Sequence, residues 1–174
     1  MSVAPGSAGL LIRPVEPADY DDVARLTVAA YAADGQLDGE HGYGKVLADT
    51  ATRAALGQML VAVDVASGAA LGAVTFVLPG TPFAELSRDG EAEFRTLAVD
   101  PAAQRRGVAR ALVQACVDRA TALRASAVVI SVRDFADSAQ RLYEGCGFVR
   151  IPELDWSPAP GVNLLGLRLA LPHS

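Results

Sequence analysis

The sequence contains few of the residues that metal sites and disulfide frameworks require. Its 174 residues include two cysteines and two histidines, and the histidines, His41 and His173, lie far apart in the chain. This spacing provides no set of zinc ligands, so no metal site is expected. Cys116 falls within an apolar helical pattern and Cys146 within a Glu-Gly-Cys-Gly segment, which favours reduced thiols over a disulfide.

Long apolar runs and an excess of basic residues are also missing. The longest apolar stretches, such as 58–65 and 123–132, are far shorter than the roughly 20 residues of a membrane-spanning helix. Residues 1–9 lack the basic start and apolar run of a signal peptide, and we expect them to be a flexible leader. The formal net charge of −5 argues against broad nucleic-acid binding. These absences predict a cytoplasmic protein that binds neither membranes nor nucleic acid.

The length and the 51% share of hydrophobic residues suit one core, so residues 10–174 are expected to form a single domain. Apolar segments bounded by turn residues predict strands at 10–13, 58–65, 69–78, 91–99, 126–132, 148–151 and 162–171. Apolar spacings of three and four predict helices over 17–33, over 45–56, from 107 to 123 and around 139–143. The segments 34–44 and 79–90 are expected to be irregular. This order predicts an α/β or α+β fold with a mixed central sheet.

The most informative segment joins the strand expected at 91–99 to the helix that begins at Gly107. At such a helix start, unpaired backbone N–H groups and the positive end of the helix dipole attract anions. Gly107 lets the backbone approach a ligand closely, and Ala109 keeps the next turn slim. Charge-assisted donors come from a local group of arginines, Arg105, Arg106 and Arg110. The segment therefore predicts a phosphate-binding loop.

Other phosphate loops do not match this segment. It lacks the Gly, four-residue gap, Gly-Lys-Ser/Thr pattern of nucleotide hydrolases and the three-glycine dinucleotide fingerprint. The remaining alternative is an ordinary strand-to-helix turn with solvated arginines.

Two segments resemble the GNAT superfamily of acyl-CoA-dependent N-acetyltransferases. Gln104, Gly107 and Ala109 match the family pattern of Gln or Arg, two residues, Gly, one residue, and Gly or Ala after a strand. Residues 139–148, Ala-Gln-Arg-Leu-Tyr-Glu-Gly-Cys-Gly-Phe, are similar to the family's Ala-x-x-Leu-Tyr-x-x-x-Gly-Phe segment. The resemblance implies a mixed, strongly twisted sheet flanked by helices. It also implies that coenzyme A is wedged where two neighbouring parallel strands splay apart.

The resemblance implies roles for particular residues. The pantetheine arm of acetyl-CoA would bind backbone groups of Leu97, Ala98 and Val99, and a backbone N–H near Leu97 would polarise the thioester carbonyl. The pyrophosphate would be bound by the loop of Gln104, Arg105, Arg106, Gly107, Val108, Ala109 and Arg110.

Tyr143 matches the family's general acid, which protonates the departing thiolate of coenzyme A. The alternative is a tyrosine that packs in the core beside Leu142. Many family members carry an asparagine seven residues before this tyrosine, where the present chain has Ala136. Ser138 is a candidate to replace that asparagine.

A base must take a proton from the acceptor amine, which is mostly charged at neutral pH. Strand alternation places Glu91, Glu93 and Arg95 on one face of the strand expected at 91–99. We expect Glu93 to act as the base, directly or through water, with Glu91 as a second candidate. The alternative is that both glutamates are solvated or paired with Arg95.

The acceptor region is less sharply defined. Asp34, Asp38 and Glu40 would attract a cationic acceptor if their segment borders the cleft, although exposed loops are commonly acidic. Trp156 has three alternatives: the acceptor pocket, a homodimer contact, or packing against the sheet. Cys146 has no histidine nearby to activate it, which disfavours a covalent acetyl-cysteine route.

These residues and the resemblance predict an enzyme that transfers an acetyl group from acetyl-CoA directly to an amine of a small molecule or a protein. The alternative function is a non-catalytic acyl-CoA-binding sensor or structural module. The absence of the asparagine at Ala136 motivates that alternative.

Overall fold

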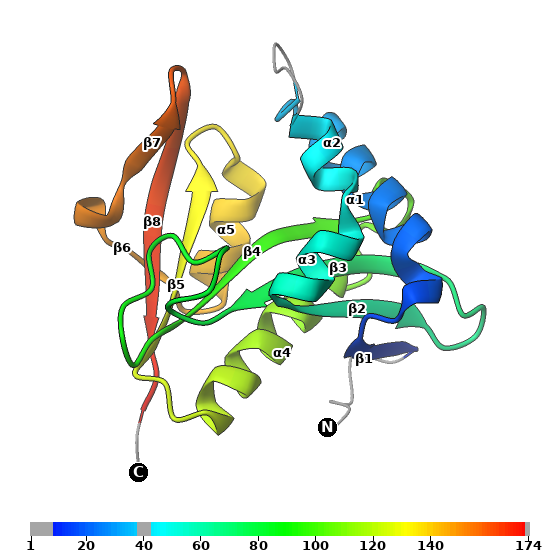
Figure 1. Ribbon diagram of the computed structural model, residues 1–174, viewed down its shortest axis with the longest axis horizontal. Helices are drawn as coiled ribbons and strands as arrows, with labels where there is room; N and C mark the ends of the chain where they lie inside the picture. The colour runs from blue at the N-terminus through cyan, green and yellow to red at the C-terminus, as the bar shows by residue number, and fades with distance from the viewer. Residues whose placement is uncertain (1–8, 38–42, 173–174) are drawn as a thin grey trace. The chain divides into compact units, whose positions relative to one another are not determined.

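The computed structural model describes residues 9–37 and 43–172, and the chain forms two compact units (Figure 1). The first unit comprises Met1–Phe76 and Thr96–Ala115, and the second comprises Val77–Arg95 and Cys116–Ser174. The division passes through strand β4 (Ala92–Val99) and helix α4 (Val108–Ala122), so each of these elements contributes residues to both units.

The first unit contains the strands β1 (Leu10–Pro14), β2 (Gln58–Asp64) and β3 (Ala70–Val77, all but its last residue). Pairing is antiparallel between β1 and β2 and between β2 and β3, as expected for the hairpin at 58–78. The helical elements before β2 are η1 (Pro17–Asp19), α1 (Tyr20–Ala33), α2 (Tyr43–Ala48) and α3 (Thr50–Leu56). After β4 follow η2 (Pro101–Ala103) and the start of α4.

Opposite faces of β3 carry α1 and α4. Ala73 belongs to a buried cluster with Val23 and Leu26 of α1, whereas Gly72 lies against Val108 and other residues of α4. Neighbouring residues of a strand point to opposite faces, so the two helices cover the two sides of this strand. Burial of each large apolar side chain in such a cluster contributes about 1.5–3 kcal/mol relative to exposure.

The second unit is built around β5 (Ala127–Arg133), which pairs in parallel with the start of β4 and antiparallel with β8 (Val162–Ala170). β6 (Val149–Arg150) and β7 (Trp156–Ala159) also pair with β8, and η3 (Pro152–Leu154) lies between them in the chain. Figure 1 shows β7 in orange beside β8 in red. Helix α5 (Asp137–Gly145) connects β5 to β6.

All eight strands belong to one sheet, in the order β1-β2-β3-β4-β5-β8-β6 with β7 on β8. The pairs are mostly antiparallel, with β4 and β5 parallel. The predicted mixed sheet flanked by helices is therefore confirmed. Among the described residues, no helix is long and apolar enough to cross a membrane.

Several local predictions are wrong. Residues 156–159 were expected to be a rigid loop because of the prolines, yet they form β7, which pairs on one side only and so tolerates Pro158. The helix expected over 45–56 is divided at Asp49, whose carboxylate accepts a hydrogen bond from Thr52 N–H and caps α3. Neither Asp134 nor Asp137 caps α5, which has Ala136 at its N-cap and no side-chain cap.

Gly166 of β8 provides the first test of the packing. Its N–H donates to Asp155 Oδ1 at 2.8 Å, and a Cβ added to it would overlap Leu154 Cβ and lie 3.0 Å from the Leu154 carbonyl carbon. We expect Gly166→Ala to lower the free energy of unfolding by about 1–3 kcal/mol, measured by urea denaturation. Gly44→Ala is the control, because a Cβ at Gly44 meets no atom within 4 Å. Equal stability of the two variants would contradict this view of the η3 turn.

Candidate active site

The backbone of β4 changes conformation at Thr96. This β-branched residue has a φ of 55°, in the left-handed region that such residues rarely occupy, at a cost on the order of 1–3 kcal/mol. Ala98 beyond it is buried, whereas Leu97 and Val99 are half-buried. The simple alternation expected for the whole strand therefore does not continue past Thr96. Strain of this kind is often found at functional sites.

Asp100 turns the chain out of β4. Its backbone N–H donates to the Leu71 carbonyl at 2.8 Å, and its carboxylate accepts from Ala102 N–H at 3.0 Å. The other carboxylate oxygen lies 3.2 Å from Arg25 Nη1 of α1. These bonds fix where the loop before α4 begins.

The loop between η2 and α4 exposes its backbone donors. Arg105 and Gly107 have positive φ values of 68° and 76°, and residues 104–107 are exposed. No backbone N–H from Gln104 to Arg110 donates a hydrogen bond to another residue that the structure describes. The first hydrogen bond into α4 is from Ala111 N–H to the Gly107 carbonyl at 3.0 Å. A run of unpaired N–H groups at a helix start is the arrangement that binds phosphate.

The arginines of this loop are not equivalent. Arg106 Nη1 lies 2.9 Å from Asp64 Oδ2, at the turn between β2 and β3. The guanidinium of Arg106, together with the N–H groups of Ala66 and Ser67, holds the pKa of the Asp64 carboxyl below its usual range. The side chains of Arg105 and Arg110 are exposed, and neither forms an ion pair with a described residue. They remain the charged donors available for an anion.

Gly72 allows α4 to begin close to the sheet. A Cβ at this position would lie 2.8 Å from Val108 Cγ1 and 2.9 Å from the carbonyl oxygen of Ala98. Val108 is the first residue of α4, and Ala98 belongs to β4. The missing side chain thus sets the distance between the loop's helix and the strand that precedes it. Sequence analysis overlooked Gly72 because one glycine in a strand pattern does not reveal what faces it.

Tyr143 of α5 lies in an aromatic cluster in the second unit. Its side chain is 7% exposed, and its ring centroid lies 5.9 Å from those of both Phe94 and Phe148. Burial raises the pKa of the phenol above its ordinary value, so the hydroxyl is protonated at neutral pH. Among the described residues the hydroxyl has no hydrogen-bond partner. The position is compatible with both alternatives, a proton donor and a packed core tyrosine.

Both cysteines are free thiols. Burial raises the pKa of Cys116, which disfavours the reactive thiolate form of this residue.

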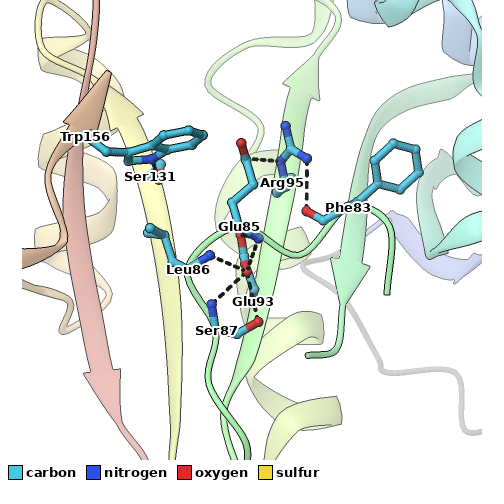
Figure 2. A network of polar contacts seen from close by, with 8 residues as sticks. All are labelled: Phe83, Glu85, Leu86, Ser87, Glu93, Arg95, Ser131 and Trp156. Atoms are coloured by element: carbon cyan, nitrogen blue, oxygen red, sulfur yellow. Dashed lines mark hydrogen bonds and ion pairs between the residues drawn. The ribbon is translucent and has the colours of Figure 1, made fainter. Parts of the chain in front are cut away.

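Glu93 is buried in a shell of donors (Figure 2). Its Oε1 accepts from the N–H groups of Glu85, Leu86 and Ser87 at 3.0–3.1 Å and from the Ser87 hydroxyl at 2.9 Å. Its Oε2 lies 3.2 Å from the Glu85 nitrogen. The segment 79–90, expected to loop outward, is therefore anchored to β4. A carboxylate engaged in this way has to lose some of these bonds before it accepts another proton.

Glu85 offers a more accessible carboxylate in the same network. Its Oε1 lies 2.7 Å from Arg95 Nε, and its side chain is 22% exposed. Burial raises the pKa of Glu85 above its usual value, Arg95 opposes this shift, and the Glu93 charge adds to it. Arg95 also donates to the Phe83 carbonyl at 2.9 Å. Sequence analysis missed Glu85 because the residue lies in an irregular segment with no periodicity.

The remaining candidates have other partners. Glu91 lies 3.4 Å from Arg168 Nε and accepts from Arg88 N–H, so its partner is not Arg95. Trp156 Nε1 donates to the Ser131 hydroxyl at 3.3 Å (Figure 2). Asp34 ends α1, whereas Asp38 and Glu40 lie outside the described residues.

The candidates fall into two groups. The residues expected to bind coenzyme, from Leu97 to Val99 and from Gln104 to Arg110, belong to the first unit. Tyr143 and Glu93 belong to the second. Among the described residues, no three His, Cys, Asp or Glu side chains are grouped so that they could hold a metal ion.

A match to a protein family agrees with these features. Residues 58–148 match the model of the Acetyltransferase (GNAT) family, and this match covers more than half of the chain. The chain therefore belongs to the GNAT acetyltransferase family. The matched range includes β4, the loop before α4, and Tyr143.

Solved structures of this family share the fold. A GCN5-related N-acetyltransferase from Kribbella flavida is 26% identical, with a TM-score of 0.66 and coverage of 94% of this chain and 98% of that chain. The ribosomal-protein-S18-alanine N-acetyltransferase of Escherichia coli is 17% identical, with a TM-score of 0.68 and coverage of 95% and 96%. A Salmonella typhimurium protein described as an acetyltransferase, solved with its cofactor acetyl-CoA, is 22% identical, with a TM-score of 0.66 and coverage of 96% of both chains. A search of the curated proteins gave no significant match.

Substitution of Gly72 tests whether the start of α4 is held in place by close packing. We expect Gly72→Ala to lower stability by about 1–3 kcal/mol, because the Ala98 carbonyl oxygen is backbone and cannot rotate away. We also expect several-fold weaker binding of acetyl-CoA, measured by calorimetry, because the loop amides move with the start of α4. Gly44→Ala serves again as the control. Unchanged affinity in a destabilised Gly72→Ala protein would show that the loop does not depend on this packing.

Proposed function

We propose that this chain is an N-acetyltransferase that moves an acetyl group from acetyl-CoA directly to an amine. The observation that carries the proposal is the run of unpaired N–H groups from Gln104 to Arg110 at the start of α4, in a chain of the GNAT family. The acetyl-CoA bound to the Salmonella typhimurium protein supports the choice of acyl donor. The cytoplasmic location and a homodimer remain predictions.

In this proposal the pyrophosphate of acetyl-CoA binds the loop amides and the exposed cations of Arg105 and Arg110. Arg106 contributes mainly by holding the loop to Asp64, which it contacts at 2.9 Å. Backbone groups of Leu97, Ala98 and Val99 bind the pantetheine arm, and a backbone N–H near Leu97 stabilises the negative charge on the thioester oxygen.

The transfer itself requires two proton movements. The acceptor ammonium first loses a proton to a base, and the free amine nitrogen attacks the thioester carbon to give a tetrahedral intermediate. The carbon–sulfur bond then breaks, the acetyl group remains on nitrogen, and the thiolate of coenzyme A takes a proton from the Tyr143 hydroxyl. The raised pKa of Tyr143 supports the donor role, because it keeps the phenol protonated until the thiolate forms.

Two carboxylates are candidates for the base. Glu93 is the residue that the sequence predicts, but its oxygens face donors of the 85–87 segment and its side chain is 1% exposed. Glu85 is more accessible, and its pKa is raised toward neutrality by burial. A base works best when its pKa lies near the working pH. We therefore propose Glu85 as the alternative base, with Glu93 as the residue that fixes its loop.

Thiol release from acetyl-CoA over a panel of small amines and peptides tests the function. We expect release that depends on an amine, and we expect Tyr143→Phe to reduce turnover at least about 100-fold, since it removes the acid. Affinity for acetyl-CoA should change little, because the phenylalanine keeps the aromatic packing. Equal turnover in Tyr143→Phe would leave Tyr143 as a core residue.

The rival function is a non-catalytic acyl-CoA-binding sensor or structural module. It is favoured by Ala136, which gives α5 no side-chain cap where many relatives carry asparagine. Tight binding of acetyl-CoA without any acetylated product would support this rival. A protein that shows no heat of binding with acetyl-CoA would exclude both functions.

Paired glutamine variants assign the base. We expect Glu85→Gln to lower kcat by about 100-fold or more and to remove the loss of activity as the pH falls through the Glu85 pKa. Glu93→Gln should instead lower the melting temperature, because it removes charge-assisted bonds to the 85–87 segment. Glu144→Gln, on the exposed surface of α5, is the control. A stable Glu93→Gln protein that loses activity and its pH dependence would return the role to Glu93.

A further inference from the structure

Arg53 is a buried cation with two nitrogens that have no partner. The residue lies on α3, and its side chain is 5% exposed. Nη1 donates to the Val46 carbonyl at 2.8 Å, whereas Nε and Nη2 form no hydrogen bond. Thr50, one turn earlier on the same helix, is 2% exposed, and its hydroxyl is also without a partner. Because Val46 lies seven residues before Arg53, the guanidinium extends back along the chain past Thr50.

The described residues supply no buried counter-ion for this charge. Asp49 is near enough to act on the Arg53 charge, but it is exposed, and its carboxylate accepts from Thr52 N–H and the Thr52 hydroxyl. Burial lowers the pKa of Arg53, with partial opposition from Tyr31, Asp49 and Tyr43. A guanidinium kept from water without an acceptor is costly, so an arrangement of this kind indicates a missing anion.

The free nitrogens define the shape of that anion. With Nη1 occupied by a carbonyl, Nε and Nη2 remain, and they form the side edge of the guanidinium. Two parallel N–H groups on this edge match the two oxygens of a carboxylate. The Thr50 hydroxyl adds a further donor, and the small exposed fraction of Arg53 suits a compact planar anion.

We propose that Arg53 and Thr50 bind the carboxylate of the acceptor, so that the acceptor is an amine that also carries a carboxylate, such as an α-amino acid. This inference rests on the proposed acetyltransferase function. The carboxylate lies side-on against Nε and Nη2 of Arg53 and accepts a hydrogen bond from Thr50. The neutral amine is then held for attack on the thioester.

Matched acceptor pairs test the inference. Each of several α-amino acids is compared with its amide and with the amine that lacks the carboxylate, for example leucine, leucinamide and isopentylamine. We expect the wild-type protein to favour the amino acid of at least one set by about tenfold or more in kcat/KM. Arg53→Met should abolish that preference. Arg53→Lys should restore it only in part, because lysine keeps the charge but loses the paired donors.

Thr50→Val is the second variant, since removal of a buried arginine can unfold α3. It should reduce the preference several-fold while leaving the circular dichroism spectrum unchanged. Arg124→Met, at an exposed position, is the control and should keep the full preference.

A binding measurement separates this inference from the proposed enzymatic activity. Thermal stabilisation by the preferred amino acid, tested without acetyl-CoA across the same panel, should be present in the wild type and absent in Arg53→Met. Such binding without acetyl transfer would support the carboxylate site and count against the enzyme. Acetylation of amines with no preference for a carboxylate, or a preference that persists in folded Arg53→Met, would overturn the site and leave the enzyme intact. Stabilisation by no amino acid, together with no preference, would also overturn it.

Discussion

The carboxylate of Glu93 is almost completely removed from water, and a buried charge is stable only when donors surround it. The chain meets this requirement with its own backbone, because the N–H groups of Glu85, Leu86 and Ser87 all point at one oxygen. The segment before β4 is thereby tied to the strand it leads into. Its closure places Glu85 beside Arg95 and brings the Phe83 carbonyl within reach of the same arginine. The polar network of the second unit follows from this one buried carboxylate.

Arg53 presents the opposite case in the first unit. Its charge is as deeply buried, yet it has one carbonyl as its partner and two nitrogens with none. A satisfied buried charge organises structure, whereas an unsatisfied one raises the free energy of the empty protein and lowers it again when a ligand arrives. The difference between these two residues separates a structural role from a binding role.

Much of the fold could be predicted from sequence because its signals are local. Continuous apolar segments predicted β2, β3 and β5, and the turn residues between 65 and 69 predicted the hairpin. The loop before α4 could also be predicted, since Gly107 and the helix pattern after it carry physical meaning on their own. Glu85, Gly72 and the left-handed conformation of Thr96 could not, because each depends on what lies opposite in three dimensions. Proline in β7 misled for the related reason that its tolerance depends on pairing at one side only.

The loop from Gln104 to Arg110 is shaped before any ligand is present. Asp100 fixes its start through Leu71 and Ala102, Gly72 lets α4 begin close to β4, and Arg106 ties its middle to Asp64. Each of these contacts lies outside the set of groups offered to an anion, which are the unpaired backbone N–H groups and the exposed cations of Arg105 and Arg110. The contacts that order the loop and the donors that bind are thus different atoms. Binding then does not have to supply the free energy of ordering the loop, so more of the interaction with phosphate is available as affinity.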